Sequence, residues 1–314
     1  MHKAQKLTVV MYHYVRPILE SAYPEIKGLE VDGFRRQLDY LEQRYNYVTM
    51  EEVVGAISRG LELPESPVLL TFDDGYVDHY QHVFPELSKR GVQGSFFVST
   101  DVIYEKGFLD VNRIHYLLAC VEDKRDLVEE IYIQLNFVRE EYGLDSNAEL
   151  FGRYSNVGYH KDLPEVRFTK QILQRALPLK VRVKLIDKLF SKYVTDDAES
   201  FHSKLYLGME QLKEMKNGGM HIGSHAKSHQ WLSTLTEEEQ RDELVSSIEL
   251  LKAVGEDPNT SSICYPYGDY NETTLRLANE LNYQVGFSTQ VAPAILNRMN
   301  ALMLPRYDTN DFPQ

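Results

Sequence analysis

The chain of 314 residues is predicted to fold as an α/β protein, with a barrel of strand–helix units and a helical insertion. Short apolar runs alternate with amphipathic helical segments in residues 1–100 and again in 205–314, which is typical of a parallel sheet covered by helices. Residues 101–204 interrupt this alternation. The strand–helix units number about seven, the content of a barrel slightly smaller than the eight-fold one.

Capping and turn signals mark the elements of the first part of the barrel. Thr49 and Glu52 form a capping box that begins a helix, and Arg90-Gly91 ends another. A buried strand ends at Asp73-Asp74-Gly75, because carboxylates and glycine fit poorly in an apolar strand. The elements predicted here are strands over 7–11, 68–72 and 95–98, a helix from Thr49, and a helix over 80–89.

The second part of the barrel repeats these signals. Asn217-Gly218-Gly219 ends a helix, a capping box of Thr236 and Glu239 begins the next, and Asn271 caps a third. The predicted strands are 220–223, 262–265, 283–288 and 302–304, and the predicted helices are 209–216, 236–253 and 271–282.

Residues 101–204 are predicted to form a helical insertion that separates the two parts of the barrel, 1–100 and 205–314. The insertion contains two charged amphipathic segments, 114–142 and 169–193. Apolar side chains recur in it at helical spacing, at Leu117, Leu118, Val121, Val128, Ile131 and Leu135. This stripe predicts packing against the barrel or against a second copy of the chain, so the insertion could support a homo-oligomer.

Charge and composition exclude several classes of protein. Lysine and arginine number 34 against 47 aspartate and glutamate, a net charge of −13 that repels nucleic acids and anionic membranes. Every apolar run is shorter than the ~20 residues that span a bilayer, and the first is shorter than the ~7 to 15 residues at the centre of a secretion signal. We therefore expect no nucleic-acid partner, no membrane span and a cytoplasmic location.

Two pairs of polar residues follow predicted strands, where βα folds bind ligands. Asp73 and Asp74 follow one strand, and His225 and His229 follow another. If the histidines lie on a helical turn, their four-residue spacing brings the Cβ atoms to ~5 to 6 Å, which suits chelation. Taken alone, one aspartate could cap a helix and the other could be solvated. Together, the two pairs favour a metal site.

One aspartate and two histidines suit Zn²⁺ and leave a coordination position open for catalysis. The residue after His225 is Ala226 and not the glutamate of zinc proteases, which disfavours that class. A third loop, Cys264 to Gly268, also follows a predicted strand. Its backbone N–H groups could stabilise an oxyanion, although the segment could equally be an ordinary Pro-Gly turn.

These three loops resemble the polysaccharide deacetylase, or NodB-homology, family of carbohydrate esterases. The resemblance covers roughly residues 7–100 and 205–306, and it rests on the ordered motifs Thr71-Phe72-Asp73-Asp74-Gly75, Ser224-His225-Ala226-Lys227-Ser228-His229 and Tyr265-Pro266-Tyr267-Gly268. It implies a distorted (β/α)7 barrel that hydrolyses N-acetyl groups on sugars with a divalent metal, for which Zn²⁺ is our first choice.

The resemblance also implies roles for single residues. It makes Asp73 the general base, makes Asp74, His225 and His229 the metal ligands, and makes Tyr267 a backbone N–H donor to the oxyanion. Tyr265, Pro266 and Arg306 are assigned to substrate binding. Arg306 could also orient Asp73, although a surface ion pair is the more ordinary interpretation.

The chain departs from the usual family pattern at three places. The last motif, residues 302–307, contains no histidine to act as the general acid. The family's biofilm exopolysaccharide deacetylases have that histidine near the N-terminus, and His13 in Tyr12-His13-Tyr14-Val15 matches it, although His13 could also be an ordinary buried histidine. Ala226 replaces the usual serine or threonine, and Cys264 replaces an arginine that orients the base.

The leading hypothesis is metal-dependent de-N-acetylation of an N-acetylated sugar in a surface polysaccharide or its precursor. A small-molecule amide hydrolase on the same barrel is one alternative, and a catalytically impaired carbohydrate-binding homologue is another. An iron oxygenase using two histidines and a carboxylate is disfavoured, because nothing in the sequence indicates a site for a cosubstrate.

Overall fold

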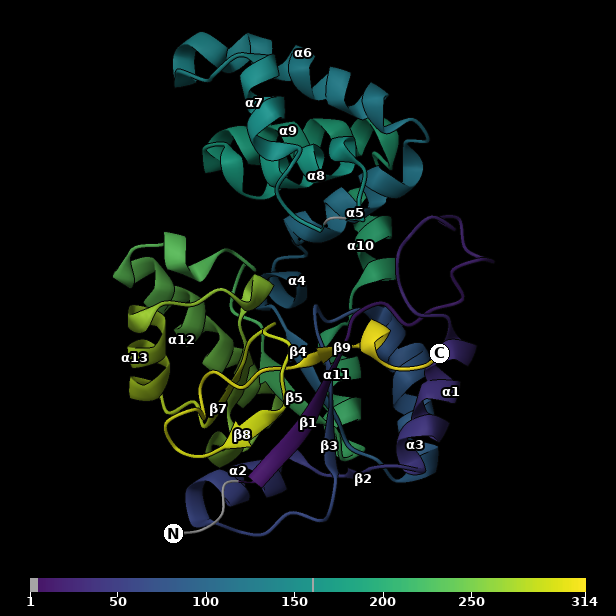
Figure 1. The fold of residues 1–314 in the computed structure, drawn as a ribbon, viewed down its shortest axis with the longest axis vertical. Coiled ribbons are helices and arrows are strands. Elements are labelled where there is room, and N and C mark those ends of the chain that lie inside the picture. Colours follow the sequence, from purple (N-terminus) through teal and green to yellow (C-terminus); the bar gives the residue numbers. More distant parts are fainter. Residues whose placement is uncertain (1–4, 160) are drawn as a thin grey trace. The chain divides into compact units, whose positions relative to one another are not determined.

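The computed structural model describes residues 5–159 and 161–314, and the chain divides into two compact units (Figure 1). The first unit consists of Met1–Pro17, Gly28–Gly107 and His202–Gln314, and the second of Ile18–Lys27 and Phe108–Phe201. The boundaries that the sequence predicts for the insertion, 101 and 204, stay a prediction. In the described ranges, no helix is long and apolar enough to cross a membrane.

A curled, mainly parallel sheet forms the centre of the first unit. Its strands follow the order β7-β6-β5-β4-β3-β1-β8. In this order the strands are β7 Val285–Phe287, β6 Ser262–Cys264, β5 His221–Ser224, β4 Gly94–Val98, β3 Pro67–Phe72, β1 Gln5–Tyr12 and the antiparallel β8 Ala294–Leu296. Two short strands complete the sheet, β2 Asn46–Tyr47 beside β3 and β9 Tyr307–Asp308 beside β1.

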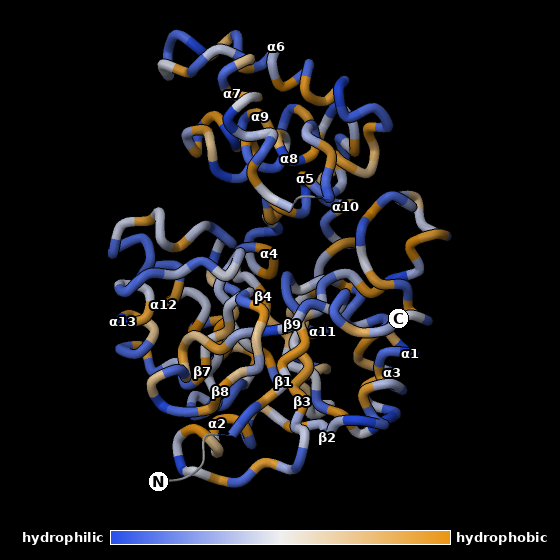
Figure 2. The backbone as a smooth tube through the Cα atoms, in the orientation of Figure 1, coloured by the Kyte–Doolittle hydropathy of each residue, from blue (hydrophilic) through white to orange (hydrophobic). Residues whose placement is uncertain are grey.

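Helices cover this sheet, and the predicted α/β fold class is confirmed. Figure 1 shows α12 and α13 on one flank of the strands and α1 and α3 on the other. The helices are α1 Val31–Glu42, α2 Met50–Arg59, α3 Phe84–Arg90, α4 Thr100–Tyr104, α11 Met209–Asn217, α12 Glu237–Val254 and α13 Glu272–Glu280. Apolar residues are frequent along β1, β3 and β4 (Figure 2), and β3, β4, β5 and β6 are buried at every position.

The capping signals locate two helix starts correctly. Both predicted capping boxes form, Thr49 with Glu52 at the start of α2 and Thr236 with Glu239 at the start of α12. Both helices end at a glycine in the left-handed conformation, which has no Cβ to clash there.

Other predicted elements need correction. The helix predicted over 80–89 begins as a π-helical turn, His79–Val83, before α3. The strand predicted over 302–304 is a turn with one parallel bridge between Leu304 and Phe287, and the last strand is β9. Helix α1, which was not predicted, buries Phe34, Leu38 and Leu41 against the sheet.

The second unit is helical and has its own apolar core. The two segments predicted over 114–142 and 169–193 are broken into shorter helices, α5 Asp110–Cys120, α6 Lys124–Tyr142, α7 Asn147–Tyr154, α8 Pro164–Gln171 and α9 Leu179–Tyr193. A π-helical turn, Ile172–Ala176, joins the last two, and α10 Ala198–Leu205 returns the chain to the first unit. The predicted stripe residues Leu117, Ile131 and Leu135 are buried in this core.

Candidate active site

Parallel pairing brings the carboxyl ends of β3, β4 and β5 to one edge of the sheet. Phe72, the last residue of β3, pairs with Phe96, and Phe96 pairs with Ile222, two residues before the end of β5, so the segments that follow β3 and β5 leave the sheet at the same edge. Asp74 and Gly75 both have positive φ, 73° and 69°. A Cβ on Gly75 would lie 2.9 Å from Val98 Cγ1, so this turn requires glycine.

Asp74, His225 and His229 converge at this edge and form a buried group of three ligands. Asp74 Oδ1 lies 3.3 Å from His225 Nε2 and 3.5 Å from His229 Nε2. The three ligand atoms all lie within 4.8 Å of one another. Ligands about 2.0–2.2 Å from a tetrahedral Zn²⁺ lie about 3.3–3.6 Å apart, so the spacing of the two Asp74 contacts fits such an ion.

The two histidines lie on a loop, so the helical turn expected for them is wrong. Ala226 and His229 both have positive φ, 59° and 57°, and these left-handed residues fold the loop so that both imidazoles face Asp74. His225 Nδ1 lies 2.6 Å from the carbonyl oxygen of Cys264. Because a carbonyl only accepts, Nδ1 carries the proton and Nε2 keeps its lone pair for a ligand.

The protonation states of this group suit a cation. Burial lowers the pKa of His229 to about 3, so the imidazole is neutral near pH 7. Burial opposes ionisation of Asp74, but its interactions with the surrounding histidines, His225 first, hold the pKa of Asp74 well below its usual value. Burial opposes protonation of His225, but its interactions with the two aspartates raise the pKa of His225, so a cation bound there would displace the proton from His225 Nε2. A neutral imidazole and an ionised carboxylate are the forms that bind metal.

A second group of possible ligands, Glu51, His221 and Glu256, lies at the opposite, amino ends of the strands. There Glu256 already accepts hydrogen bonds from Lys216 Nζ at 2.7 Å and from the Ile222 N–H at 3.0 Å. The lysine ammonium would repel a divalent cation at this position. We therefore favour the first group as the metal site.

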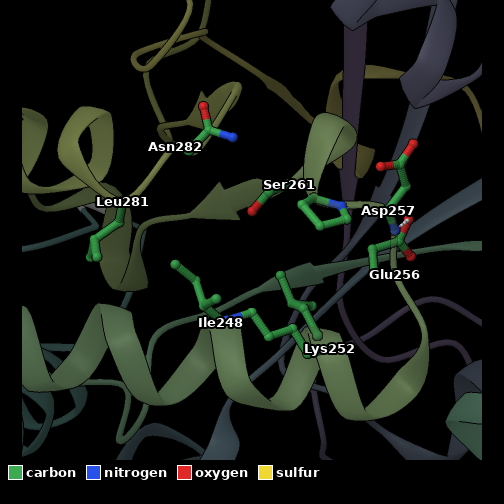
Figure 3. Close-up of a pocket in the computed structure, with 9 residues that line it drawn as sticks. Ile248, Lys252, Glu256, Asp257, Ser261, Leu281 and Asn282 are labelled. Carbon is green, nitrogen blue, oxygen red and sulfur yellow. Dashed lines mark hydrogen bonds between the residues drawn. The ribbon is translucent and has the colours of Figure 1, made fainter.

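A cavity beside Glu256 also lies at the amino ends of the strands. It is lined by the end of α12, the loop before β6 and the turn before β7 (Figure 3). Its labelled lining residues, Ile248, Lys252, Glu256, Asp257, Ser261, Leu281 and Asn282, include none of the predicted site residues.

Asp73, next to the metal group, is held by a buried ion pair with Arg306. Arg306 donates from Nη1 at 3.0 Å and from Nη2 at 2.8 Å to the two carboxylate oxygens. Its other hydrogen bonds go to Thr71 Oγ1 and the carbonyl oxygen of Ser288. Arg306 is only 1% exposed, so the expected surface ion pair is wrong.

The charge of Arg306 controls the ionisation of Asp73. Burial alone would raise the pKa of this carboxyl, but the charges of Arg306 and His225 together lower it to about 2. Asp73 is therefore ionised at every pH near neutrality, as a proton acceptor must be.

His13 and Tyr267 border the same group of residues. His13 directly follows β1 and is partly buried, and its charge contributes to the lowered pKa values of Asp73 and Asp74. Tyr267 has a φ of 57°, and its ring lies 4.6 Å from the His229 ring. The Tyr267 ring also stacks on the Trp231 ring, with the ring centres 4.3 Å apart and an angle of 5° between the planes. Trp231 was not among the residues predicted for the site, although it follows His229 by only two positions.

The other predicted contacts of this loop lie in the interior of the unit. Tyr265 is fully buried, and its hydroxyl donates to the carbonyl oxygen of Leu302 at 2.9 Å. Pro266 is buried as well. Because Tyr265, Pro266 and Arg306 are all buried, the geometry does not favour the sugar contacts predicted for them, and these contacts stay predictions.

The sequence profile of the polysaccharide deacetylases matches residues 60–132 and 185–286, more than half of the chain. The chain belongs to the polysaccharide deacetylase family. The predicted family is thus confirmed, and with it the coarse function, that of a hydrolase acting on acetyl groups of a sugar polymer. The matched ranges include Asp73, Asp74, His225, His229 and Tyr267.

Two curated proteins are similar to this polysaccharide deacetylase in sequence. YxkH of Bacillus subtilis, named as a polysaccharide deacetylase, is 22% identical over 93% of the chain and 67% of its own length. The poly-β-1,6-N-acetyl-D-glucosamine N-deacetylase of Escherichia coli is 38% identical over 69 residues, which are 22% of the chain and 10% of that protein.

Solved structures show that the fold is shared. The deacetylase PplD of Streptococcus pyogenes, solved with acetate, has a TM-score of 0.61 at 22% identity. The alignment covers 98% of this chain and 93% of the PplD chain. IcaB of Ammonifex degensii has a TM-score of 0.54 at 20% identity, and the alignment covers 96% of this chain and 90% of the IcaB chain. The predicted (β/α)7 barrel class is confirmed by these neighbours.

Proposed function

We propose that this deacetylase removes acetyl groups from the nitrogen of an N-acetylated sugar in a metal-dependent hydrolysis. The observation that carries the proposal is the convergence of Asp74, His225 and His229 beside an ionised Asp73. The E. coli relative, whose name states that it deacetylates poly-β-1,6-N-acetyl-D-glucosamine, supports a surface polysaccharide or its precursor as the substrate. The cytoplasmic location and the homo-oligomer stay predictions.

Different side chains would hold the metal and accept the proton of the attacking water. A divalent metal held by Asp74, His225 and His229, most simply Zn²⁺, would polarise the acetamide carbonyl and lower the pKa of a water molecule. Asp73 would accept the proton of the attacking water, since its carboxylate is ionised and held in position by two hydrogen bonds from Arg306.

Charge that develops on the acetamide oxygen needs a hydrogen-bond donor, and the departing nitrogen needs a proton. We assign the first role to the backbone N–H of Tyr267, whose left-handed conformation sets its direction. We assign the second to His13, because an amide anion is a very poor leaving group and requires a general acid.

Acetate release from a panel of N-acetylated saccharides tests the proposed function. The panel contains chitooligosaccharides, β-1,6-linked N-acetylglucosamine oligomers and a small non-sugar acetamide. Release from saccharides that stops after chelation and returns with Zn²⁺ supports the proposal. Release from the small acetamide alone would favour the amide hydrolase, and saccharide binding without release at saturating metal would favour the impaired homologue.

The impaired homologue has lost part of its support. That alternative rests on the missing histidine in residues 302–307 and on Cys264, which stands where other family members carry the arginine that orients the base. Arg306 reaches Asp73 from the other end of the chain and provides two hydrogen bonds to its carboxylate. The active enzyme is therefore the function that the geometry supports best.

The His13→Ala variant is expected to lower kcat for the N-acetylated saccharide by about 10²- to 10⁴-fold, the usual contribution of a general acid. The activity of the variant on an aryl acetate ester should fall far less, because the leaving group of this ester departs without a proton. His82→Ala, on the π-helical turn, is the control and should behave like the unaltered protein. Equal losses on both substrates would contradict the role assigned to His13.

The His229→Ala variant is expected to weaken Zn²⁺ binding by more than about tenfold, measured by competition with a chromogenic chelator, because one of three protein ligands is lost. Glu51→Gln alters the second group of possible ligands at an exposed position and should leave affinity and stoichiometry unchanged. The opposite pattern, with a loss in Glu51→Gln only, would place the metal at the amino ends of the strands.

A further inference from the structure

The loop from His225 to His229 holds both imidazoles in a conformation that its own sequence does not favour. Two of its residues, Ala226 and His229, are non-glycine residues with positive φ. Such residues are uncommon and persist only where neighbouring groups hold them. The contacts that fix this loop therefore support the metal site, although the groups that hold the loop are not themselves metal ligands.

Backbone carbonyls of the loop are held by the segment that follows β4. Ser99 Oγ donates to the carbonyl oxygen of His225 at 2.8 Å. The Thr100 N–H donates to the carbonyl oxygen of Ala226 at 3.2 Å, and the Asp101 N–H donates to the carbonyl oxygen of Lys227 at 2.9 Å. Three consecutive carbonyl groups are thus bound from one side.

Two adjacent N–H groups of the loop are held by one carboxylate from α12. Glu243 Oε2 accepts the N–H of Lys227 and the N–H of Ser228, both at 2.9 Å. Glu243 Oε1 accepts the hydroxyl of Ser228. Glu243 as a whole is 5% exposed, so water cannot easily replace its carboxylate.

We propose that Glu243 is a positioning residue for metal binding, which fixes the His225–His229 loop so that both imidazoles already face Asp74 before the ion arrives. This inference rests on the metal site of the proposed function. A loop ordered in advance loses less conformational entropy when the ion binds. Substitution of groups that orient metal ligands typically costs 10- to 100-fold in affinity, and we expect the same range for Glu243.

The neighbouring Asp242 provides a matched comparison. Asp242 pairs with the side chain of Lys227 at 2.8 Å, whereas Glu243 binds the backbone of the same residue. The Asp242 side chain is 62% exposed. Removing the Asp242 charge therefore alters the electrostatics near the loop and leaves its backbone hydrogen bonds in place.

The test measures Zn²⁺ and Co²⁺ dissociation constants of the metal-free full chain by chelator competition, together with its thermal unfolding. Glu243→Met, which keeps the length of the side chain and removes both acceptors, should weaken metal binding by about 10- to 100-fold. Glu243→Gln keeps one acceptor for the two N–H groups and should stay within about threefold of the unaltered protein. Asp242→Asn should leave both metal dissociation constants unchanged.

A control separates positioning from general destabilisation. Leu250 is a buried residue of α12 and makes none of the hydrogen bonds described for the loop. Leu250→Ala should therefore lower the unfolding temperature and leave the metal dissociation constant unchanged. The visible spectrum of bound Co²⁺ should change in Glu243→Met and not in Leu250→Ala. If Glu243→Met fails to fold, Glu243→Asp replaces it, since the shorter carboxylate should also loosen the loop and weaken binding.

Two results would overturn the inference. One is an unchanged metal affinity in Glu243→Met or, in its place, Glu243→Asp, while the unaltered protein binds the ion. The other is a loss in Glu243→Gln equal to that in Glu243→Met, which would assign the effect to charge. Failure of the unaltered chain to bind any metal would instead refute the proposed function.

Discussion

Acetate release is expected to fall by about 10²- to 10⁴-fold when Asp73 is replaced by asparagine, because the amide cannot accept the proton of the attacking water. The variant should still bind metal with nearly normal affinity, since Asp73 is not among the three converging ligands. Its amide oxygen can keep one hydrogen bond from Arg306, so the local structure should survive. Steady-state kinetics and metal titration of the same preparation measure both quantities.

Asp74→Asn is the matched comparison for this prediction. The two aspartates are adjacent in the chain and equally buried, but only Asp74 lies within ligand distance of both imidazoles. Asp74→Asn should therefore lose metal affinity and activity together. If Asp73→Asn keeps full activity, or if both variants lose metal equally, the division of roles between base and ligand is wrong.

Replacing Arg306 by methionine is expected to lower the free energy of unfolding by about 3–5 kcal/mol at pH 7, because it leaves the Asp73 carboxylate buried without its cationic partner. Urea denaturation measures this loss. Activity should fall as well, since the carboxylate would no longer be held by two hydrogen bonds.

The pH dependence of this loss has a defined sign. In the unaltered protein the pKa of Asp73 lies at about 2, below the ordinary value of 3.8, so the pair stabilises the fold above pH 3.8 and this contribution is lost as the pH falls toward 2. Without Arg306, burial should raise the pKa of Asp73 above 3.8. The difference between the variant and the unaltered protein should then be largest near neutral pH and shrink as the solution is acidified.

The double variant Asp73→Asn/Arg306→Met provides the control. Because it removes both charges, it should be more stable than Arg306→Met alone at pH 7. A loss of less than about 1 kcal/mol in Arg306→Met, the size of a surface ion pair, would show that the pair contributes little. A loss independent of pH would show that packing of the arginine, and not its charge, stabilises the unit.

The barrel could be predicted from local patterns. Apolar runs bounded by polar residues predicted β1, β3, β4, β5, β6 and β7, and two capping boxes located the starts of α2 and α12. These signals involve residues that are close in sequence, so they can be recognised without knowledge of the folded structure. The segment Leu302–Leu304 was misassigned because a short apolar run fits a strand and a buried turn equally well.

The candidate site was predictable only in part. Asp74, His225 and His229 were found because each follows a strand, and parallel strands bring their carboxyl ends to one edge. The reason given for the histidine pair was wrong, since left-handed residues of a loop and not a helical turn bring the rings together.

The α/β class, the family and the residue types that can bind a metal at the strand ends follow from the order of residues along the chain. The contact of Arg306 with Asp73 and that of Glu243 with the His225–His229 loop arise only when the chain is folded. The first pair is 233 residues apart. A contact of this kind depends on how the sheet curls and which helix packs beside the loop, and no short-range pattern of side chains encodes either one.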